Sequence, residues 1–465
     1  MVAANIAKPP PKREQGKQAL PRRWAGYLLS ATVVMSAAPP VRAAAPPPPA
    51  APAENTAVSP SLRELAVLRA RPFERMDTDG NGELSDVELP LQLISSFSRA
   101  DANHSGGIDR TELDAEFKRL EARLTRGPAL DPDKPPRTWA EVDRALDRLV
   151  AHHELEGAAL LVGRGEKIIF EGYAGSYNAD SLVNMASASK WPGGAAIAAA
   201  VAEGKLDPDA PLSSWRPGLI GTPKANLTLT QLMSFTAGAA AIGDGTPDIA
   251  LDPRIDIQEA ADRLLQFDLV APPGTEFAYG GWTQQVGAAW AVAATGEPFV
   301  KLWNRTVGGP ARMTSSHFGH PQKSRDGLDL PNPNLQSGLW TTPRDYARFL
   351  MMMSTGGKVG GKQVYPAAAI KLIETDHAAG LPHRWRSAGA EAGRSYGFAA
   401  WCETTRPDGS CAAVSSGGAW GTLPWIDREK DLWGLFFVFD RGPRLREDLS
   451  VLRKAAEAIV VNKGD

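Results

Sequence analysis

Apolar and polar positions divide the chain into segments with different periodicities. Residues 138–153 have helical spacing, and two apolar runs, 158–162 and 167–170, follow with a glycine-containing turn between them, which predicts a β-hairpin. Near the other end, residues 432–439 form a continuous apolar run typical of a buried strand, and residues 445–461 form an amphipathic helix. Strands at both ends with helical patterns between them predict an α/β unit whose sheet is completed by both ends.

Residues 1–43 have the pattern of a signal peptide. Basic residues up to Arg22 and Arg23 precede a short apolar run at 24–35, and residues 41–43 fit a small-x-small cleavage pattern. The apolar run is short for a spanning helix, and an uncleaved membrane anchor is the alternative. We therefore expect a periplasmic or secreted protein with no stable membrane insertion after the signal peptide is cleaved.

Two proline-rich stretches separate the rest of the chain into parts. Residues 44–60 form an Ala/Pro tract that cannot build a core and predicts an extended linker. An acidic, helix-forming segment covers 61–126, a second linker covers 127–137, and residues 138–465 contain no such break and predict one large domain. The formal net charge of −2 gives no field that would attract nucleic acid.

The acidic segment contains two tandem loops, 77–88 and 101–112, that place oxygen-bearing side chains at alternating positions and end in Glu. They closely resemble the EF-hand family over about 65–124, which implies Ca²⁺ as a bound cofactor, and Leu84 and Ile108 are the apolar residues expected to pair the loops. A solvated acidic turn is the alternative for a single loop. We expect constant occupancy and a structural role. The predicted ligands are Asp77, Asp79, Asn81, Glu83 and Glu88 in the first loop and Asp101, Asn103, Ser105, Gly107 and Glu112 in the second.

Two cysteines, Cys402 and Cys411, lie on either side of a Pro-Asp-Gly turn. Two strand ends joined by such a turn could bring the sulfur atoms within bridging distance. A disulfide also requires an oxidising compartment, and the signal peptide pattern predicts export into one. We therefore expect a disulfide between the two residues.

A Ser-x-x-Lys sequence at a predicted helix start supplies the candidate nucleophile. Ser187 and Lys190 are one turn apart, so they lie on the same face of a helix. The lysine can then help to remove the hydroxyl proton, and the positive end of the helix favours an alkoxide. The pair alone is a weak signal, because Ser and Lys also meet at this spacing by chance.

Other segments give the pair its context. Residues 227–238, 273–279 and 338–349, in order with the opening hairpin and the Ser-x-x-Lys pair, resemble the superfamily of class C β-lactamases, penicillin-binding proteins and serine esterases over 138–461. The resemblance implies an α/β (α+β) fold of the β-lactamase/transpeptidase type. An antiparallel sheet flanked by helices and a helical subdomain would follow a small all-α EF-hand pair.

The same resemblance assigns roles to single residues. Ser187 would be acylated, and Lys190 and Tyr279 would form the base system, in which the nearby ammonium favours a tyrosinate that takes the serine proton and later activates water. The oxyanion hole would use the Ser187 N–H and a second N–H near Gly418. The residues expected to form the oxyanion and substrate contacts are Ser415, Ser416, Gly417 and Gly418.

Two positions depart from the family pattern. Gly281 stands two places after the tyrosine where Asn is usual, and residues 415–417 read Ser-Ser-Gly where Lys-Thr-Gly or His-Thr-Gly is usual. The missing Asn would have bound a substrate amide and the missing cation a substrate carboxylate, so the departures favour ester substrates. Nearby Trp420 fits an apolar acyl pocket or a packing role equally well.

Together these patterns predict an exported serine hydrolase that acts on a small-molecule ester or amide through an acyl-enzyme. A carboxylesterase-like activity is favoured. The first alternative is a β-lactamase or a D-Ala-D-Ala carboxypeptidase-type amidase. The second is a non-catalytic calcium-binding protein, against which the presence of the serine, the lysine and the tyrosine argues.

Overall fold

The computed structural model describes residues 60–85, 88–90, 93, 96–241, 248–252, 254–280, 282–320, 330–385, 394–440 and 442–463. The predicted signal peptide, the Ala/Pro linker up to residue 59 and Gly281 lie outside the described residues. Among the described helices, none combines the length and the apolar character that a bilayer crossing requires.

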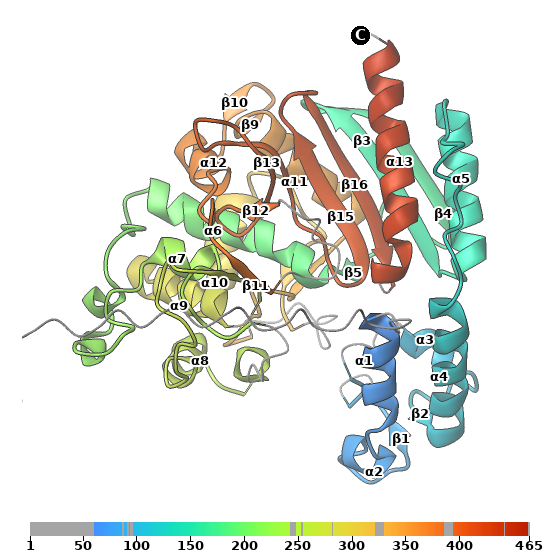
Figure 1. Cartoon of the computed structure of the whole chain (residues 1–465), viewed down its shortest axis with the longest axis horizontal. Coiled ribbons are helices and arrows are strands. Elements are labelled where there is room, and N and C mark those ends of the chain that lie inside the picture. The colour runs from blue at the N-terminus through green and yellow to red at the C-terminus, as the bar shows by residue number, and fades with distance from the viewer. Residues whose placement is uncertain are drawn as a thin grey trace, which may run out of the picture. The chain divides into compact units, whose positions relative to one another are not determined.

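A seven-stranded antiparallel sheet forms the centre of the segment after residue 138 (Figure 1). In spatial order its strands are β12 (Ser395–Tyr396), β13 (Trp401–Thr405), β14 (Cys411–Ser415), β15 (Gly421–Asp427), β16 (Leu432–Phe439), β3 (Gly157–Arg164) and β4 (Lys167–Gly175). The hairpin β3–β4 and the strand β16 confirm the sequence predictions. Because β16 pairs with β3, for example Leu435 with Leu161, both ends of the segment complete one sheet.

Helices cover both faces of this sheet. Strand β3 alternates between them: Leu160 contributes to a cluster with the helices α5 (Trp139–His153) and α13 (Gly442–Lys463), whereas Leu161 contributes to the larger cluster on the other side. Helix α11 (Pro343–Ser354) packs on that other side against β16 and β3. The α/β expectation is thereby confirmed.

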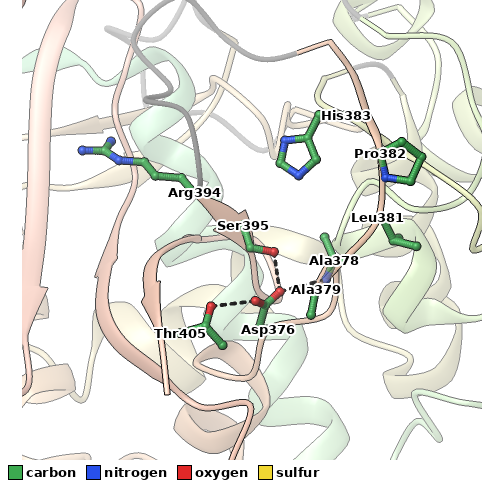
Figure 2. A pocket seen from close by; sticks show the side chains of 10 residues that line it. Asp376, Ala378, Ala379, Leu381, Pro382, His383, Arg394, Ser395 and Thr405 are labelled. Carbon is green, nitrogen blue, oxygen red and sulfur yellow. Dashed lines mark hydrogen bonds between the residues drawn. The ribbon is translucent and has the colours of Figure 1, made fainter. Parts of the chain in front are cut away.

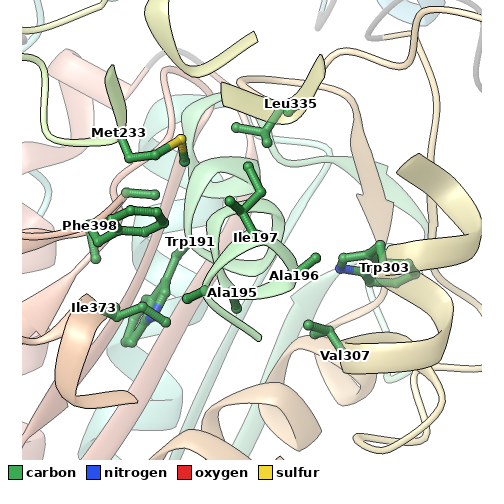
Figure 3. Packing of buried hydrophobic residues seen from close by; sticks show 14 of the residues in the cluster. Trp191, Ala195, Ala196, Ile197, Met233, Trp303, Val307, Leu335, Ile373 and Phe398 are labelled. Atoms are coloured by element: carbon green, nitrogen blue, oxygen red, sulfur yellow. The ribbon is translucent and has the colours of Figure 1, made fainter. Parts of the chain in front are cut away.

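The central helix of the second layer is α6 (Lys190–Ala202), whose residues are almost all buried. Figure 3 shows Trp191 on this helix among the surrounding apolar side chains, which include Phe398. A Cβ atom added at Gly194 would lie 2.2 Å from the Cβ of Ala399, so the glycine permits close packing of the chain against the helix. Because the packing is dense, Lys190, the first residue of α6, is held in the interior of the protein.

The remaining elements of this segment are shorter. The helices are α7 (Leu229–Met233), α8 (Ile257–Leu264), α9 (Thr283–Thr295), α10 (Phe299–Trp303), α12 (Ala367–Ile373) and the turns η2 (Ala186–Ser189), η3 (Leu212–Ser214), η4 (Pro217–Leu219), η5 (Asp248–Leu251) and η6 (Asn304–Gly308). The strands are β5 (Val183–Asn184), β7 (His317–Phe318) and β8 (Leu339–Thr341) in one sheet, β6 (Phe277–Ala278) with β11 (His383–Trp385), and β9 (Lys358–Val359) with β10 (Lys362–Gln363).

The acidic segment forms two loop-and-helix units. Its elements are α1 (Pro60–Arg69), α2 (Phe73–Met76), β1 (Glu83–Leu84), α3 (Phe97–Ala100), β2 (Ile108–Asp109) and α4 (Arg110–Leu124). Leu84 pairs with Ile108 across the two-residue strands, which confirms the predicted pairing of the loops. The units share a small apolar core of their own, and they belong with the larger segment to one compact unit, Val58–Asp465. The domain boundaries at 126 and 137 stay predictions.

A disulfide joins Cys402 on β13 to Cys411 on β14, as the turn between them predicts. Both residues are buried, and the two strands are antiparallel neighbours in the central sheet. The bridge therefore ties together the two strands that lead into and out of residues 406–410.

Candidate active site

The candidate nucleophile lies in a tight turn before α6. Ser187 belongs to η2 (Ala186–Ser189), which follows β5 directly. The preceding Ala186 has φ = 44°, a left-handed conformation that is uncommon for a residue with a Cβ atom. The Ala186 N–H donates to Oδ1 of buried Asn184 at 2.8 Å, and this hydrogen bond supports the strained turn.

The structure brings the three predicted catalytic side chains together. Lys190 Nζ donates to Ser187 Oγ at 2.8 Å and to the Gln336 carbonyl oxygen at 3.2 Å. Tyr279 shares a hydrogen bond with Ser187, and Lys190 Nζ lies 5.1 Å from the centre of the tyrosine ring. The serine hydroxyl therefore contacts both candidate proton-transfer groups.

Burial shifts the pKa values of the two candidate bases in opposite directions. It lowers the pKa of Lys190 to about 7, because the charged ammonium loses its hydration. It raises the pKa of Tyr279 to about 12, and the hydrogen bond with Ser187 offsets only part of that rise. Burial therefore opposes the tyrosinate expected from charge proximity and favours the neutral amine of Lys190.

An aromatic cluster holds the tyrosine in place. The Tyr279 ring stacks on Trp401 with a centroid separation of 5.0 Å and an interplanar angle of 20°. Phe235 lies 5.0 Å and Tyr396 lies 5.9 Å from the same ring. Since these four side chains are buried, the cluster limits the motion of the phenol and presents its hydroxyl to Ser187.

The end of β14 approaches the nucleophile through one of its two serines. Ser416 Oγ donates to the Ser187 carbonyl oxygen at 3.2 Å. Ser415, which stands where the family has a cation, is buried and lies next to the carboxylate of Glu403. Successive side chains of a strand point to opposite faces, which explains why only one serine reaches the site.

The following glycines lie against the nucleophile turn. A Cβ atom added at Gly418 would lie 2.4 Å from the Met185 carbonyl oxygen, so Gly417–Gly418 passes close to the turn that carries Ser187. The Gly418 N–H donates to the Thr422 carbonyl oxygen at 2.8 Å and is engaged within its own loop. The second oxyanion donor stays a prediction for this stretch of chain.

The first acidic loop has the geometry of a cation site. One carboxylate oxygen each of Asp77, Asp79 and Glu88 lies within 4.8 Å of the others. Gly82 has φ = 86°, a conformation suited to glycine, and its N–H donates to Asp77 Oδ2 at 2.9 Å. The Asn81 side-chain oxygen accepts from the Glu83 N–H at 2.8 Å. These residues fit a calcium ion, which prefers six to eight oxygen ligands.

The second loop is arranged in the same way. Asp101 accepts hydrogen bonds from the N–H groups of Ser105 and Gly106, and Asn103 Oδ1 accepts from Ser105 at 2.8 Å. Glu112 turns back over the loop and accepts from the Ala102 and Asn103 N–H groups. Ser105 Oγ donates to the Gly107 carbonyl oxygen at 3.1 Å. All five predicted ligands of this loop are therefore close together.

Comparison with known families gives two matches. Residues 142–458 match the Beta-lactamase family, and residues 93–118, which contain the second acidic loop, match the EF hand family. The first match covers more than half of the 465 residues. The chain belongs to the Beta-lactamase family.

Relatives and solved structures agree with this assignment. Esterase EstB of Burkholderia gladioli is 27% identical over 233 residues, which are 42% of this chain and 59% of the esterase. A beta-lactamase candidate of Bacteroides dorei is 27% identical, with a TM-score of 0.61 over 70% of this chain and 100% of that one. A penicillin-binding protein homologue of Caulobacter crescentus shares the fold at 16% identity, with a TM-score of 0.56 over 73% and 99% of the two chains.

Two residues of this Beta-lactamase-family site, Gln336 and Asn184, were not singled out by the sequence. Gln336 contributes only its carbonyl oxygen, which no side-chain pattern reveals. Asn184 binds two segments far apart in the sequence: its Oδ1 also accepts from the Trp420 indole N–H at 3.1 Å. Trp420 is buried against Phe439 and Ala186, contacts that the packing alternative expects.

A pocket of about 440 Å³ lies next to the aromatic cluster (Figure 2). Ala378 belongs to both, and His383 lies on the pocket wall with its ring 4.8 Å from Phe277. Asp376 accepts hydrogen bonds from Ser395 and Thr405 inside the pocket. Ser187, Lys190 and Tyr279 do not line it, so this pocket is a neighbour of the catalytic group rather than its centre.

Proposed function

We propose that the protein is a serine hydrolase that cleaves small-molecule esters through an acyl-enzyme on Ser187. The contact that carries the proposal is the 2.8 Å hydrogen bond between Lys190 Nζ and Ser187 Oγ, made by a lysine that is almost fully buried. A buried amine with a pKa near 7 is suited to accept and return a proton at neutral pH. Desolvation of the amine would give no advantage if the lysine had only a structural role.

In the proposed reaction the neutral amine of Lys190 takes the hydroxyl proton as Ser187 Oγ attacks the ester carbonyl carbon. The Ser187 N–H and an N–H from the 417–419 stretch would bind the oxyanion. The proton then passes to the departing alkoxide, with the protonated Tyr279 next to the serine oxygen as the other donor in reach. Water hydrolyses the acyl-enzyme by the same steps in reverse.

The preference for esters rests on what surrounds the nucleophile. Ser415, an uncharged residue, occupies the place of the family's cation, and it is buried next to Glu403. A carboxylate-bearing β-lactam or peptide would find no charged partner in residues 415–418. Similarity to an esterase at 27% identity supports the same preference.

We expect p-nitrophenyl butyrate to be hydrolysed with a kcat/KM about 30- to 150-fold above that for nitrocefin, because the missing charge-assisted contact weakens carboxylate-bearing substrates by about 2–3 kcal/mol. Steady-state kinetics on the mature protein with both substrates measures the ratio. Faster nitrocefin turnover would favour a β-lactamase. No acylation by any activated ester or fluorophosphonate would favour a non-catalytic protein.

We further propose that the EF-hand pair binds two calcium ions with a structural role. The clustered carboxylates of the first loop and the family match of the second support this. Hydrogen bonds from Ser85 and Thr78 outweigh burial and hold the pKa of Glu88 at about 2, so this carboxylate is ionised at physiological pH.

Millimolar Ca²⁺ is expected to raise the thermal unfolding midpoint by several degrees relative to EGTA. A ligand at 100 times its Kd stabilises by about 2.7 kcal/mol per site. The double variant Glu88→Gln/Glu112→Gln should lose most of this shift, whereas Glu121→Gln, an exposed glutamate on α4, should keep it. Scanning fluorimetry with Mg²⁺ as the ionic control measures the effect, and equal midpoints in Ca²⁺ and EGTA would contradict it.

Export is a third proposal. The signal-peptide pattern of residues 1–43 and the Cys402–Cys411 disulfide both suit an oxidising compartment outside the cytoplasm. N-terminal sequencing of the protein recovered from the periplasm or the medium tests it. An unprocessed N-terminus on cytoplasmic protein would refute it.

A further inference from the structure

The C-terminal end of α5 is capped by side chains from the EF-hand segment. The helix ends at His153, and Glu154 follows with φ = 52°. The last carbonyl groups of a helix lack partners within it and form its negative end, so cations are favoured there. Arg99, Arg123 and Arg126 donate to the carbonyl oxygens of Glu154, His153 and His152 at 3.3, 2.9 and 2.8 Å, respectively.

Arg123 differs from the other two arginines in its burial and in its second partner. It is fully buried, and its Nη2 lies 2.7 Å from Oδ2 of Asp440, which is also buried. Arg126 is partly exposed and pairs with the side chain of Glu154 instead. A buried pair of this kind holds its two segments in one geometry, because a charge left alone in the interior would be strongly unfavourable.

Three hydrogen bonds connect Asp440 with the turn that carries the nucleophile. Its N–H donates to the Trp420 carbonyl oxygen at 2.7 Å. The Trp420 indole N–H donates to Asn184 Oδ1, and the same oxygen accepts the N–H of Ala186, the left-handed residue before Ser187. The chain of contacts is buried along its length.

On the other side, Arg123 is joined to the second acidic loop by α4. Glu112, the last predicted ligand of that loop, lies in the first turn of the helix. Arg123 lies eleven positions after Glu112, which is close to three turns, so both lie on the same side of the helix. Arg99 lies on α3, the helix before the loop. Both helices that flank the loop therefore contact the end of α5.

We propose that Arg123 is a positioning residue that couples calcium binding in the second loop to the conformation of the Ser187 turn. Calcium ligation by Glu112 fixes the start of α4 and hence the place of the guanidinium, and Asp440, Trp420 and Asn184 carry that constraint to Ala186. The inference rests on the proposed calcium binding and on Ser187 as nucleophile. It predicts that calcium changes kcat more than KM, because the turn orients the reacting oxygen.

The test combines three measurements on the full mature protein, with Ca²⁺ or EGTA: calorimetric Ca²⁺ binding, hydrogen exchange of the peptide spanning 183–190, and kcat and KM for p-nitrophenyl butyrate. In the wild type, EGTA should increase exchange in this peptide and lower kcat at least about fivefold with little change in KM. Arg123→Met should still bind Ca²⁺ but show fast exchange and low kcat under both conditions.

Two further variants separate coupling from misfolding. Asp440→Asn keeps the backbone N–H and removes the charge, so it should lose the calcium response as Arg123→Met does. The matched control, Arg126→Met, removes an arginine from the same helix end that does not pair with Asp440, and it should keep the wild-type response.

Each contrary result has its own meaning. No calorimetric Ca²⁺ binding to the wild type would refute the calcium proposal and this inference with it. Binding without any change in exchange, or an EGTA response in Arg123→Met equal to that of the wild type, would refute the coupling alone. Absence of ester turnover would refute the proposed function, while the exchange measurements would still decide the coupling.

Discussion

Ser187→Ala is expected to lower kcat for p-nitrophenyl butyrate by about 10⁴-fold or more, because the proposed acyl-enzyme forms on its hydroxyl. The Ser187 hydroxyl contacts both Lys190 and Tyr279, so the substitution removes the oxygen atom that both of these side chains contact. Steady-state kinetics and mass spectrometry after fluorophosphonate treatment measure the effect. The wild type should gain one adduct on the peptide that contains Ser187, and the variant none.

The matched control is Ser189→Ala. Ser189 lies in the same turn, but its Oγ accepts from the Leu339 N–H at 3.0 Å and takes no part in the proposed chemistry. This variant should be labelled by the fluorophosphonate, at a lower stability. Turnover by Ser187→Ala at the wild-type rate would show that another residue is the nucleophile and would refute the mechanism.

Lys190→Met is expected to reduce kcat by about 10²- to 10⁴-fold, the usual contribution of a general base. Methionine fills a similar volume without an amine, so the packing of α6 should persist. In the wild type, kcat/KM should rise with pH through an apparent pKa of about 7, because only the neutral amine can accept the serine proton. Rates measured from pH 5 to 9 test this profile, and a flat profile would argue against Lys190 as the base.

The same substitution should stabilise the fold. The pKa of Lys190 is about 7 in the folded state and about 10.4 in an unfolded chain, so between these values the unfolded state binds more protons. The free energy of unfolding of the wild type therefore increases with pH across this window, and below it the buried lysine lowers stability in full. Lys190→Met should have a higher unfolding midpoint at pH 7 and a weaker dependence on pH. A lower midpoint would show that the amine contributes net stability.

Local sequence patterns determined much of this protein. The run at 432–439 coincides with β16, since a strand with helices on both faces of its sheet can bury consecutive apolar residues. The three-residue spacing of Ser187 and Lys190 fixed their contact, because one helical turn brings such residues together regardless of what surrounds them. The alternating ligand positions within the first acidic loop likewise determined which oxygens converge there.

Tertiary structure decided the properties that depend on distant neighbours. Burial by α6 and the aromatic cluster lowers the pKa of Lys190 and raises that of Tyr279, which opposes the expectation based on charge proximity alone. The role of Trp420 followed from Asn184, 236 residues away in the sequence. The contact between Arg123 and Asp440 spans 317 residues. The sequence by itself determined the chemical groups and their local spacing. Their pKa values arise only when distant segments pack together and exclude water, and the link between the loops and the nucleophile arises from contacts between those segments.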